Sequence, residues 1–462
     1  MSSTARTLPL SGRTAPVSGA QTPDAAKKHA LIGVLFIVAM ALPANLDLGG
    51  IRFTAYRLWL VLAFLPLFFA WVSGKYGKVG APDILFLLAG LWGAMTLIVA
   101  GYGNTLEASG IFFLELFGAY LLGRAAVRSG QDHRRVLRTL FWILAFFLPF
   151  AMIEIRTGTS VPLQFLSKFL SVHAQAWNEP RMGMERAQVI FEHPIHYGVF
   201  AASAFGFCLY SLSSGRGWMF AVLAVSVSLL STLFSVSTGP YMMLGFQLGL
   251  VLYDQITRNL PNRWRIFAIG SAIFYIILEI GTYRTPFHWI VNNLSFSTGS
   301  AYNRIRIFEW GLVNIRENPI FGIGLGDWKR ESFMSSSADN FWILITMRHG
   351  IPFLLLFSIA TILIIRRVGR ANITNKADLR LRAGYLISMG GLIIGGFTVH
   401  YWNVLFVYLM FLLGSGGWMF SAPPTEATRE DDDPAPDPTG RRITRHSGRK
   451  LGRRAQISRQ HR

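Results

Sequence analysis

Apolar runs long enough to cross a lipid bilayer recur along this sequence of 462 residues, and they constrain its fold more than any other feature. Crossing roughly 30 Å of hydrocarbon takes about 20 mostly apolar residues in a helix. Only 15% of the residues are charged, whereas soluble domains average about a quarter. Because backbone polar groups must be satisfied within the membrane, such runs fold as helices. The sequence therefore predicts an all-α polytopic membrane protein.

Twelve membrane spans account for the apolar runs between residues 31 and 420. Several runs are short, so a count of ten or eleven stays open. The polar segments 1–30 and 421–462 are expected to form disordered tails. The predicted spans are Leu31–Leu46, Phe53–Val72, Ile84–Ala100, Gly110–Leu122, Val136–Ile153, His196–Leu212, Trp218–Phe234, Tyr241–Tyr253, Trp264–Ile280, Asn340–Ile365, Tyr385–Val399 and Val404–Phe420.

Positive charge in the connecting loops predicts how the spans are oriented. Short loops on the cytoplasmic side of a membrane are enriched in lysine and arginine. If the N-terminus is cytoplasmic, every short loop on the opposite side is almost free of positive charge, and both tails are cytoplasmic. The predicted cytoplasmic segments with basic residues are 75–78, 124–135, 216, 258–265 and 366–382.

Two predicted external loops, 154–195 and 281–338, are long, and both carry arginines. Basic external loops run against the orientation rule, which suggests that their arginines have a use. The arginine side chain presents a planar fork of donors that matches phosphate oxygens. Within the second loop, Asn303–Asn318 has apolar residues at helical spacing, which predicts an amphipathic helix at the membrane surface. An anionic, membrane-bound substrate is the first hypothesis.

Polar residues in these two loops are the candidates for a functional site. Facing arginines can clamp a diphosphate and stabilise the negative charge that develops as it leaves. A nearby carboxylate or histidine can take a proton from an acceptor hydroxyl. The alternative is that the arginines only reach lipid headgroups. The candidates are Arg181, Arg186, Glu192, His193 and His196 in the first loop, and Arg304, Arg306, Glu309 and Asp339 in the second.

The sequence gives little support for disulfides, a metal site or nucleic-acid binding. The single cysteine, Cys208, excludes internal disulfides and cysteine-ligated metal centres. His193 and His196 lack an obvious third ligand, so we expect no metal site. The net charge of +20 resides mostly in short loops and tails, so we do not expect nucleic-acid binding. Arg57 and Glu115 lie within apolar spans, where they form either a functional or a structural ion pair.

Several motifs resemble those of the bacterial O-antigen ligase and polymerase family of multispanning glycosyltransferases. The block RIRIFEWGLVNIRENPIFGIGLGDW, followed after a polar stretch by DNFWILITMRHGIPF, contains an arginine before a tryptophan-containing helix, an Asn-Pro, a Gly-x-Gly and a polar pair entering a span. The segment RMGMERAQVIFEHPIHYG is similar to the family's arginine and His-Pro segment. STGP, at Ser237, stands where many members have Ser-Arg-Gly.

The sequence also departs from the family pattern. Asp339 stands in place of a histidine that is a feature of the lipopolysaccharide ligases, Phe353 in place of the second glycine of a Gly-x-x-Gly, and Thr238 in place of an arginine. A polymerase of undecaprenyl-diphosphate-linked oligosaccharide repeat units therefore fits better than a ligase. The resemblance implies a GT-C-like fold and a metal-independent, cofactor-free glycosyl transfer on the periplasmic face of the inner membrane.

The resemblance also implies roles and partners. Besides the lipid-linked oligosaccharide, the expected partners are membrane lipids and other polysaccharide assembly proteins. Asp339 is either a general base or the N-cap of the span that follows it. A flippase or a non-catalytic scaffold remains an alternative to the enzyme, although a transporter would place its polar groups near the bilayer midplane. The expected catalytic residues are Asp339, Arg304 and Arg306, and the expected substrate-binding residues are Arg181, Arg186, His193 and Glu309.

Overall fold

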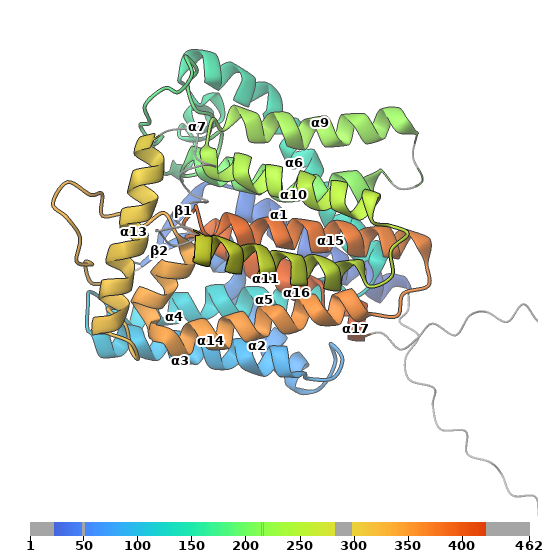
Figure 1. Cartoon of the computed structure of the whole chain (residues 1–462), viewed down its shortest axis with the longest axis horizontal. Helices are drawn as coiled ribbons and strands as arrows, with labels where there is room; N and C mark the ends of the chain where they lie inside the picture. Colours follow the sequence, from blue (N-terminus) through green and yellow to red (C-terminus); the bar gives the residue numbers. More distant parts are fainter. Residues whose placement is uncertain (1–22, 49–50, 214, 216, 282–297, 422–462) are drawn as a thin grey trace, which may run out of the picture. The chain divides into compact units, whose positions relative to one another are not determined.

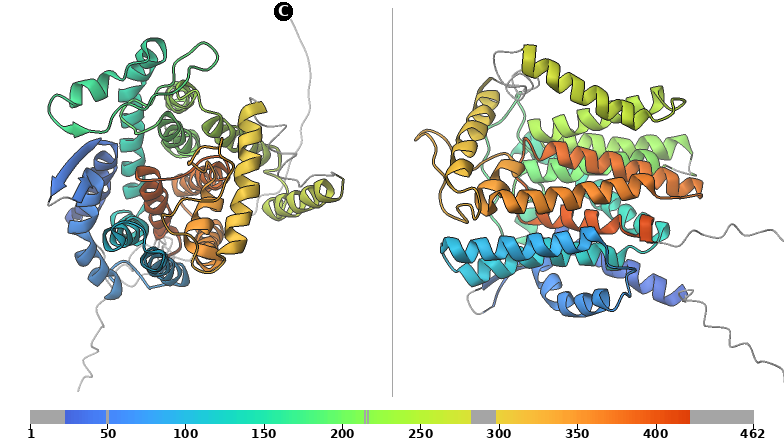
Figure 2. Two further views of the ribbon diagram at one scale, coloured as in Figure 1. Left: turned by 90° about the vertical axis from the view of Figure 1, so that its left-hand side faces the viewer. Right: turned by 60° about the horizontal axis from the view of Figure 1, so that its bottom comes forward.

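The structure is a computed structural model that describes residues 23–48, 51–213, 215, 217–281 and 298–421. Most of its helices run alongside one another in a bundle, and α13 lies across one end of that bundle (Figures 1 and 2). Most of the predicted N-terminal tail, residues 422–462 of the predicted C-terminal tail and residues 282–297 of the second long loop lie outside the described residues.

The helices follow the apolar runs of the sequence closely. Their bounds are α1 Pro23–Ala41, α2 Ala55–Val72, α3 Ala81–Ala100, α4 Thr105–Phe113, η1 Leu114–Gly118, α5 Ala119–Ala126, α6 Gly130–Thr157, α7 Val161–Leu166, α8 Pro194–Phe207, η2 Cys208–Leu212, α9 Trp218–Phe234, α10 Thr238–Ile256, α11 Arg263–Gly281, α13 Thr298–Glu317, α14 Phe341–Arg370, α15 Lys376–Gly395, α16 Val404–Ser415 and α17 Trp418–Ser421. Here η1 and η2 are single π-helical turns that continue α4 into α5 and extend α8.

Each of the twelve predicted spans overlaps one of these helical segments. Within the described residues, eight segments are long and apolar enough to cross a membrane, and two apolar stretches are shorter, His29–Ala41 within α1 and Trp218–Phe234, which is α9. The protein is therefore a mostly helical, multi-pass membrane protein, whereas the count of twelve crossings stays a prediction. The eight segments are Ala55–Val72, Ala81–Ala100, Thr105–Ala126, Gly130–Thr157, Pro194–Leu212, Arg263–Gly281, Phe341–Arg370 and Val404–Ser421.

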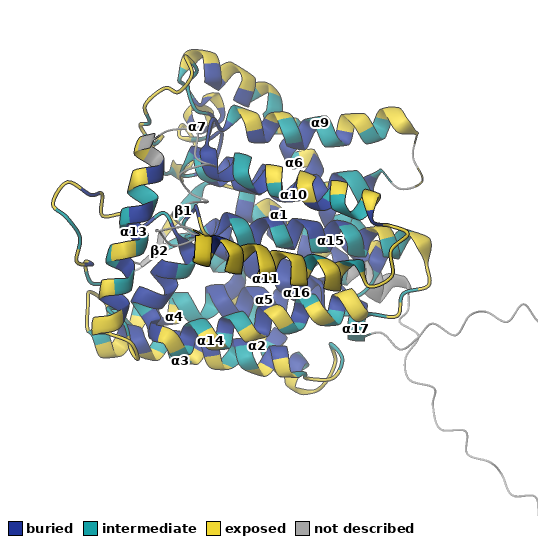
Figure 3. Cartoon of the chain, in the orientation of Figure 1, coloured by how far each residue is buried: buried dark blue, intermediate teal, exposed yellow. Residues whose placement is uncertain are grey.

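The core of the bundle is built around α16, in which every residue is buried. Glycines let α16 approach α5 closely: a Cβ on Gly414 would lie 2.0 Å from the carbonyl oxygen of Tyr120, and one on Gly123 would lie 2.2 Å from that of Phe411. Such small residues allow helices to pack tightly in lipid, where no hydrophobic force drives them together. By contrast, α11 is exposed along nearly its whole length (yellow in Figure 3).

A small antiparallel sheet corrects the prediction of a purely helical fold. Strand β1, Ala44–Leu48, pairs with β2, Ile51–Thr54, and with β3, Ser171–Val172. The first predicted span was therefore too long at its end, because α1 stops at Ala41 and Pro43 cannot supply an N–H to continue it. At the other end, α1 begins at Pro23 within the predicted tail, and its apolar part, His29–Ala41, begins close to the predicted start of the span.

The predicted cytoplasmic and external loops lie at opposite ends of the bundle. At one end, Arg134 pairs with Asp378 at 2.6 Å, which joins two of the predicted cytoplasmic segments. At the other, the sheet joins the first two spans to the first long loop. We call this second end the loop-bearing end. The grouping agrees with the predicted alternation of loops, and the side of the membrane that each end faces stays a prediction.

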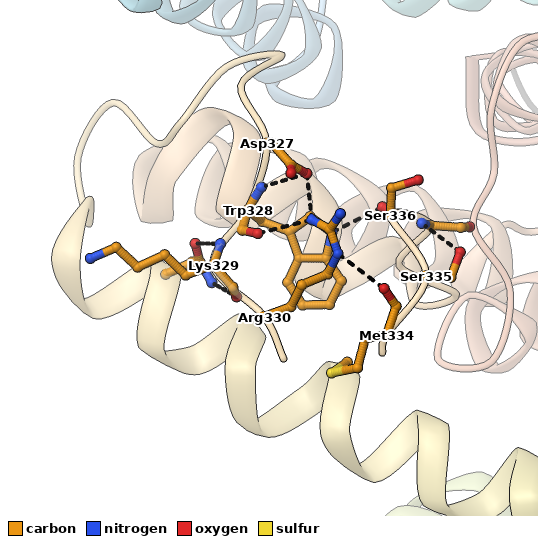
Figure 4. A network of polar contacts seen from close by, with 9 residues as sticks. Asp327, Trp328, Lys329, Arg330, Met334, Ser335 and Ser336 are labelled. Carbon is orange, nitrogen blue, oxygen red and sulfur yellow. Dashed lines mark hydrogen bonds and ion pairs between the residues drawn. The ribbon is translucent and has the colours of Figure 1, made fainter. Parts of the chain in front are cut away.

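The second long loop contains the predicted amphipathic helix, which is α13. Its apolar residues Ile305 and Ile315 are buried. The segment that follows α13 folds back on itself: Trp328 donates from Nε1 to the carbonyl of Ser336 at 2.9 Å, and Arg330 bonds both Asp327 and the carbonyl of Met334 (Figure 4). Arg330 therefore has a local structural role.

Candidate functional site

Four of the predicted site residues come together where the two long loops meet. The charges of Arg304, Arg186 and Arg181 all act on the carboxylate of Asp339. Arg304 comes from α13, Arg181 and Arg186 from the first long loop, and Asp339 from the entrance to α14. We call these four residues the arginine cluster. Three arginines and one aspartate leave the ionised cluster strongly positive.

Asp339 is a partly buried carboxylate that does not cap the following helix. Burial raises the pKa of Asp339, outweighing a 3.1 Å hydrogen bond from the hydroxyl of Ser337 and the attraction of the three arginines. The N-cap of α14 is instead Asn340, whose Oδ1 accepts a hydrogen bond from the backbone N–H of Ile343 at 3.1 Å. The interpretation of Asp339 as the cap is therefore wrong. Its role as a general base stays a prediction.

Neutral groups hold Arg186 in place. Its two terminal nitrogens donate to Asn178 at 3.2 Å and to the hydroxyl of Ser237 at 3.0 Å, and its Nε is buried without a partner in the described part of the chain. Ser237 belongs to the STGP motif. Burial, followed by the charge of Arg181, lowers the pKa of Arg186 to about 10. The guanidinium still carries its charge at neutral pH, and no carboxylate is hydrogen-bonded to it among the described residues.

His193 lies beside the arginine cluster as a neutral side chain. Burial and the charges of Arg186 and Arg181 lower the pKa of His193 to about 4. Its Nδ1 caps α8 by accepting from the N–H of Ile195 at 3.1 Å, so the ring hydrogen is placed on Nε2. His193 is thus positioned to donate a hydrogen bond to a substrate rather than to act as a base.

Arg306 lies apart from the arginine cluster, and Glu309 is a residue of the same helix whose charge acts on Arg306. Arg306 is two residues beyond Arg304, roughly 200° around the helix, and it binds Glu331 at 2.7 Å together with the hydroxyl of Tyr302. Glu309 is exposed. The structure therefore brings four of the seven predicted residues into one cluster, with His193 beside it, whereas Arg306 and Glu309 are not part of it.

A cavity of about 330 Å³ lies within the loop-bearing end. The predicted pairing of Arg57 with Glu115 is confirmed at 2.7 Å, and the pair forms part of its wall. Arg57 also donates to Asn403 at 3.1 Å, and Asn403 donates to Glu192 at 2.8 Å. Glu192 precedes His193, so this chain of contacts connects the cavity to the arginine cluster.

A kink in α14 shapes another part of the cavity wall. Gly350 has φ of 78°, a conformation that favours glycine, and it interrupts the helix. The segment after Pro319 satisfies the freed backbone groups: the N–H of Ile323 donates to the carbonyl of Met347 at 2.8 Å, and the N–H of Ile351 donates to the carbonyl of Pro319 at 2.8 Å. The Asn-Pro and Gly-x-Gly motif therefore has a structural role in docking this loop onto the kink.

Sequence reasoning missed Arg348 and His400, which also line the cavity. Arg348 could have been found from the sequence, because a charged residue within an apolar span is treated as a functional candidate. His400 lies in the tight turn between the last two predicted spans and was not among the candidate residues. Burial and the charge of Arg348 lower the pKa of His400 to about 3, so this ring is neutral.

The chain matches no known protein-family model and no curated protein. The structure itself defines the class: a multi-pass helical membrane protein that carries a cavity and an arginine-rich site at one end of its bundle. Its activity has to be inferred from the chemistry of those residues.

Proposed function

We propose that the protein belongs to the O-antigen ligase and polymerase family, and that it polymerises undecaprenyl-diphosphate-linked oligosaccharide repeat units for an exopolysaccharide or O-antigen. It would do so in the bacterial inner membrane, at the periplasmic face, with both termini in the cytoplasm. The observation that carries the proposal is the convergence of arginines from both long loops on one carboxylate. A diphosphate diester has one ionised oxygen on each phosphorus, which suits such a cluster.

The proposed reaction assigns a step to each part of the cluster. An acceptor hydroxyl attacks the anomeric carbon of the donor sugar, a new glycosidic bond forms, and the bond from that carbon to the diphosphate oxygen breaks. Asp339 takes the hydroxyl proton. Arg181, Arg186 and Arg304 stabilise the negative charge that develops on the departing undecaprenyl diphosphate. His193 donates a hydrogen bond to the donor, and the reaction uses no metal ion.

The location of the charged residues favours this enzyme over a transporter. Flippases and secondary transporters place polar groups near the bilayer midplane, whereas the arginine cluster lies in loops at one end of the bundle. A ligase would use the same donor chemistry and differ only in its acceptor, so acceptor dependence has to be measured.

The direct test uses purified full-length protein and lipid-linked repeat units extracted from cells that lack this gene. A polymerase should convert the single units into a ladder of longer glycans on a gel, with EDTA present. A ligase would give product only after a second acceptor lipid is added, and a flippase would give no new covalent product.

An Asp339→Asn preparation is the matched control, because it keeps the size of the side chain and leaves the Asn340 cap intact. Under the proposal it yields no ladder while it elutes as a folded protein. The polymerase proposal fails if the wild type leaves the single units unchanged.

A further inference from the structure

Among the described residues, no counter-charge faces one positive charge that lines the cavity, that of Arg348. Arg57 is neutralised by Glu115 at 2.7 Å. Arg348 also lines the cavity, yet its side chain makes no hydrogen bond or ion pair with any described residue, and no carboxylate among them acts on its charge. Because an uncompensated charge is costly inside a membrane protein, the cavity is suited to a ligand that brings one negative charge.

The rest of the cavity wall limits the size and nature of that ligand. A volume of about 330 Å³ is near the lower end of the roughly 300–1,000 Å³ typical of small-molecule sites. Aromatic side chains, including Phe112, Tyr401 and Trp402, make up much of the wall. Asn403 and His400 add neutral polar groups. These features suit a compact ring with hydroxyl groups and one anionic substituent.

We propose that this cavity binds a carboxylate-bearing sugar of the acceptor glycan, with its carboxylate on Arg348. The inference rests on the proposed function and assigns to that enzyme an acidic repeat unit. A single carboxylate matches the charge of Arg348 and its fork of donors. A diphosphate carries more charge and finds more arginines in the neighbouring arginine cluster.

The contacts of Glu192 link the cavity to the arginine cluster. Glu192 accepts hydrogen bonds from Trp402 and Asn403, both of which line the cavity, and it directly precedes His193 of the donor site. A sugar bound in the cavity is therefore adjacent to the site where the donor would react. This arrangement assigns the acceptor to the cavity and the donor to the arginine cluster.

The binding test uses the full-length protein in detergent and saturation-transfer NMR titrations with glucuronate, glucose and inorganic phosphate. Glucuronate should bind at least tenfold more tightly than glucose, since the two differ mainly in the carboxylate. Arg348→Gln should abolish that difference. Arg316→Gln, which removes an exposed arginine on α13, should leave it unchanged.

A second variant covers the case in which Arg348→Gln does not fold. Ala108→Phe adds bulk to the cavity wall and keeps Arg348, so it should also block glucuronate. Unchanged glucuronate binding in either folded variant overturns the proposal, as does phosphate binding more tightly than glucuronate and displacing it. Because the titration needs no catalysis, it can fail while the glycan ladder forms, and it can succeed while the ladder does not.

Discussion

Arg124 is buried and Arg186 is half-buried, and these two arginines at opposite ends of the bundle have different kinds of partner. Arg124, with 2% of its side chain exposed, forms an ion pair with Asp83 and bonds the carbonyl of Tyr76. Arg186 bonds only neutral groups among the described residues, Asn178 and Ser237. An arginine whose charge is cancelled by a carboxylate serves the fold. One that is held by neutral groups keeps its charge available for a substrate.

The largest expected effect is on stability, at Arg124. Replacing it by alanine leaves Asp83 as a buried, unpaired charge, so Arg124→Ala should lower the free energy of unfolding by about 3–5 kcal/mol. Arg134→Ala is the matched control, because its ion pair with Asp378 is partly exposed and should contribute about 0–1 kcal/mol. Denaturant titration in detergent measures both. Equal losses in the two variants would remove the distinction between the two kinds of arginine.

The next effect tests the carboxylate that the arginine cluster surrounds. Asp339→Asn should slow glycan formation at least about 100-fold, near 2.7 kcal/mol of barrier, because the amide cannot accept the acceptor's proton. Asn340→Ala should instead cost about 1 kcal/mol of stability and keep the turnover of folded protein, since it removes only the cap. If Asn340→Ala is inactive although folded, the site extends beyond Asp339.

The same carboxylate sets the expected pH dependence. A base acts only when deprotonated, and burial raises the pKa of Asp339 above its usual value. Activity should therefore be full at higher pH and fall as the pH drops through that raised value. The Asp339→Asn protein should lose this limb of the profile.

Much of the fold could be predicted because span length and loop charge are properties of local sequence. All twelve predicted spans overlap helices, and α13 appears where its apolar spacing placed it. The β1–β2 hairpin had a signal in the sequence, because Gly49-Gly50 separates its strands, whereas β3 lies more than a hundred positions from β1 and carries no strand pattern of its own. Pairings of that kind depend on the tertiary fold.

The residues of the candidate site were likewise predictable only where the signal lies in the local sequence. Arg181, Arg186, Arg304 and Asp339 were found because charge in an external loop is visible in the sequence. The separation of Arg306 from Arg304 could also have been read from helical geometry, since residues two apart do not share a helix face. The pairing of Arg57 with Glu115 was predicted from two charges within apolar spans, whereas the place of Arg348 in the same cavity depends on which helices are neighbours.

A moderate effect is expected from changing the shape of the arginines while keeping their charge. Arg186→Lys loses one of the two bonds that position the side chain and the fork that would hold a diphosphate. We expect kcat/KM to fall about tenfold or more, and the same for Arg304→Lys. Steady-state assays with the lipid-linked donor measure this. Full activity in both lysine variants would reduce these arginines to lipid anchors.

The smallest effect is expected at Arg306, and it defines the edge of the arginine cluster. Arg306→Lys keeps a positive charge beside Glu331 and Tyr302, on a different face of α13 from Arg304. Exposed ion pairs contribute little, so kcat/KM should change less than about twofold. Because Arg304 and Arg306 are two residues apart on one helix, comparing their lysine variants under one assay separates a role in the site from a general effect on α13. Equal losses at both positions would indicate a general effect on α13 and would remove the evidence that Arg304 acts within the site.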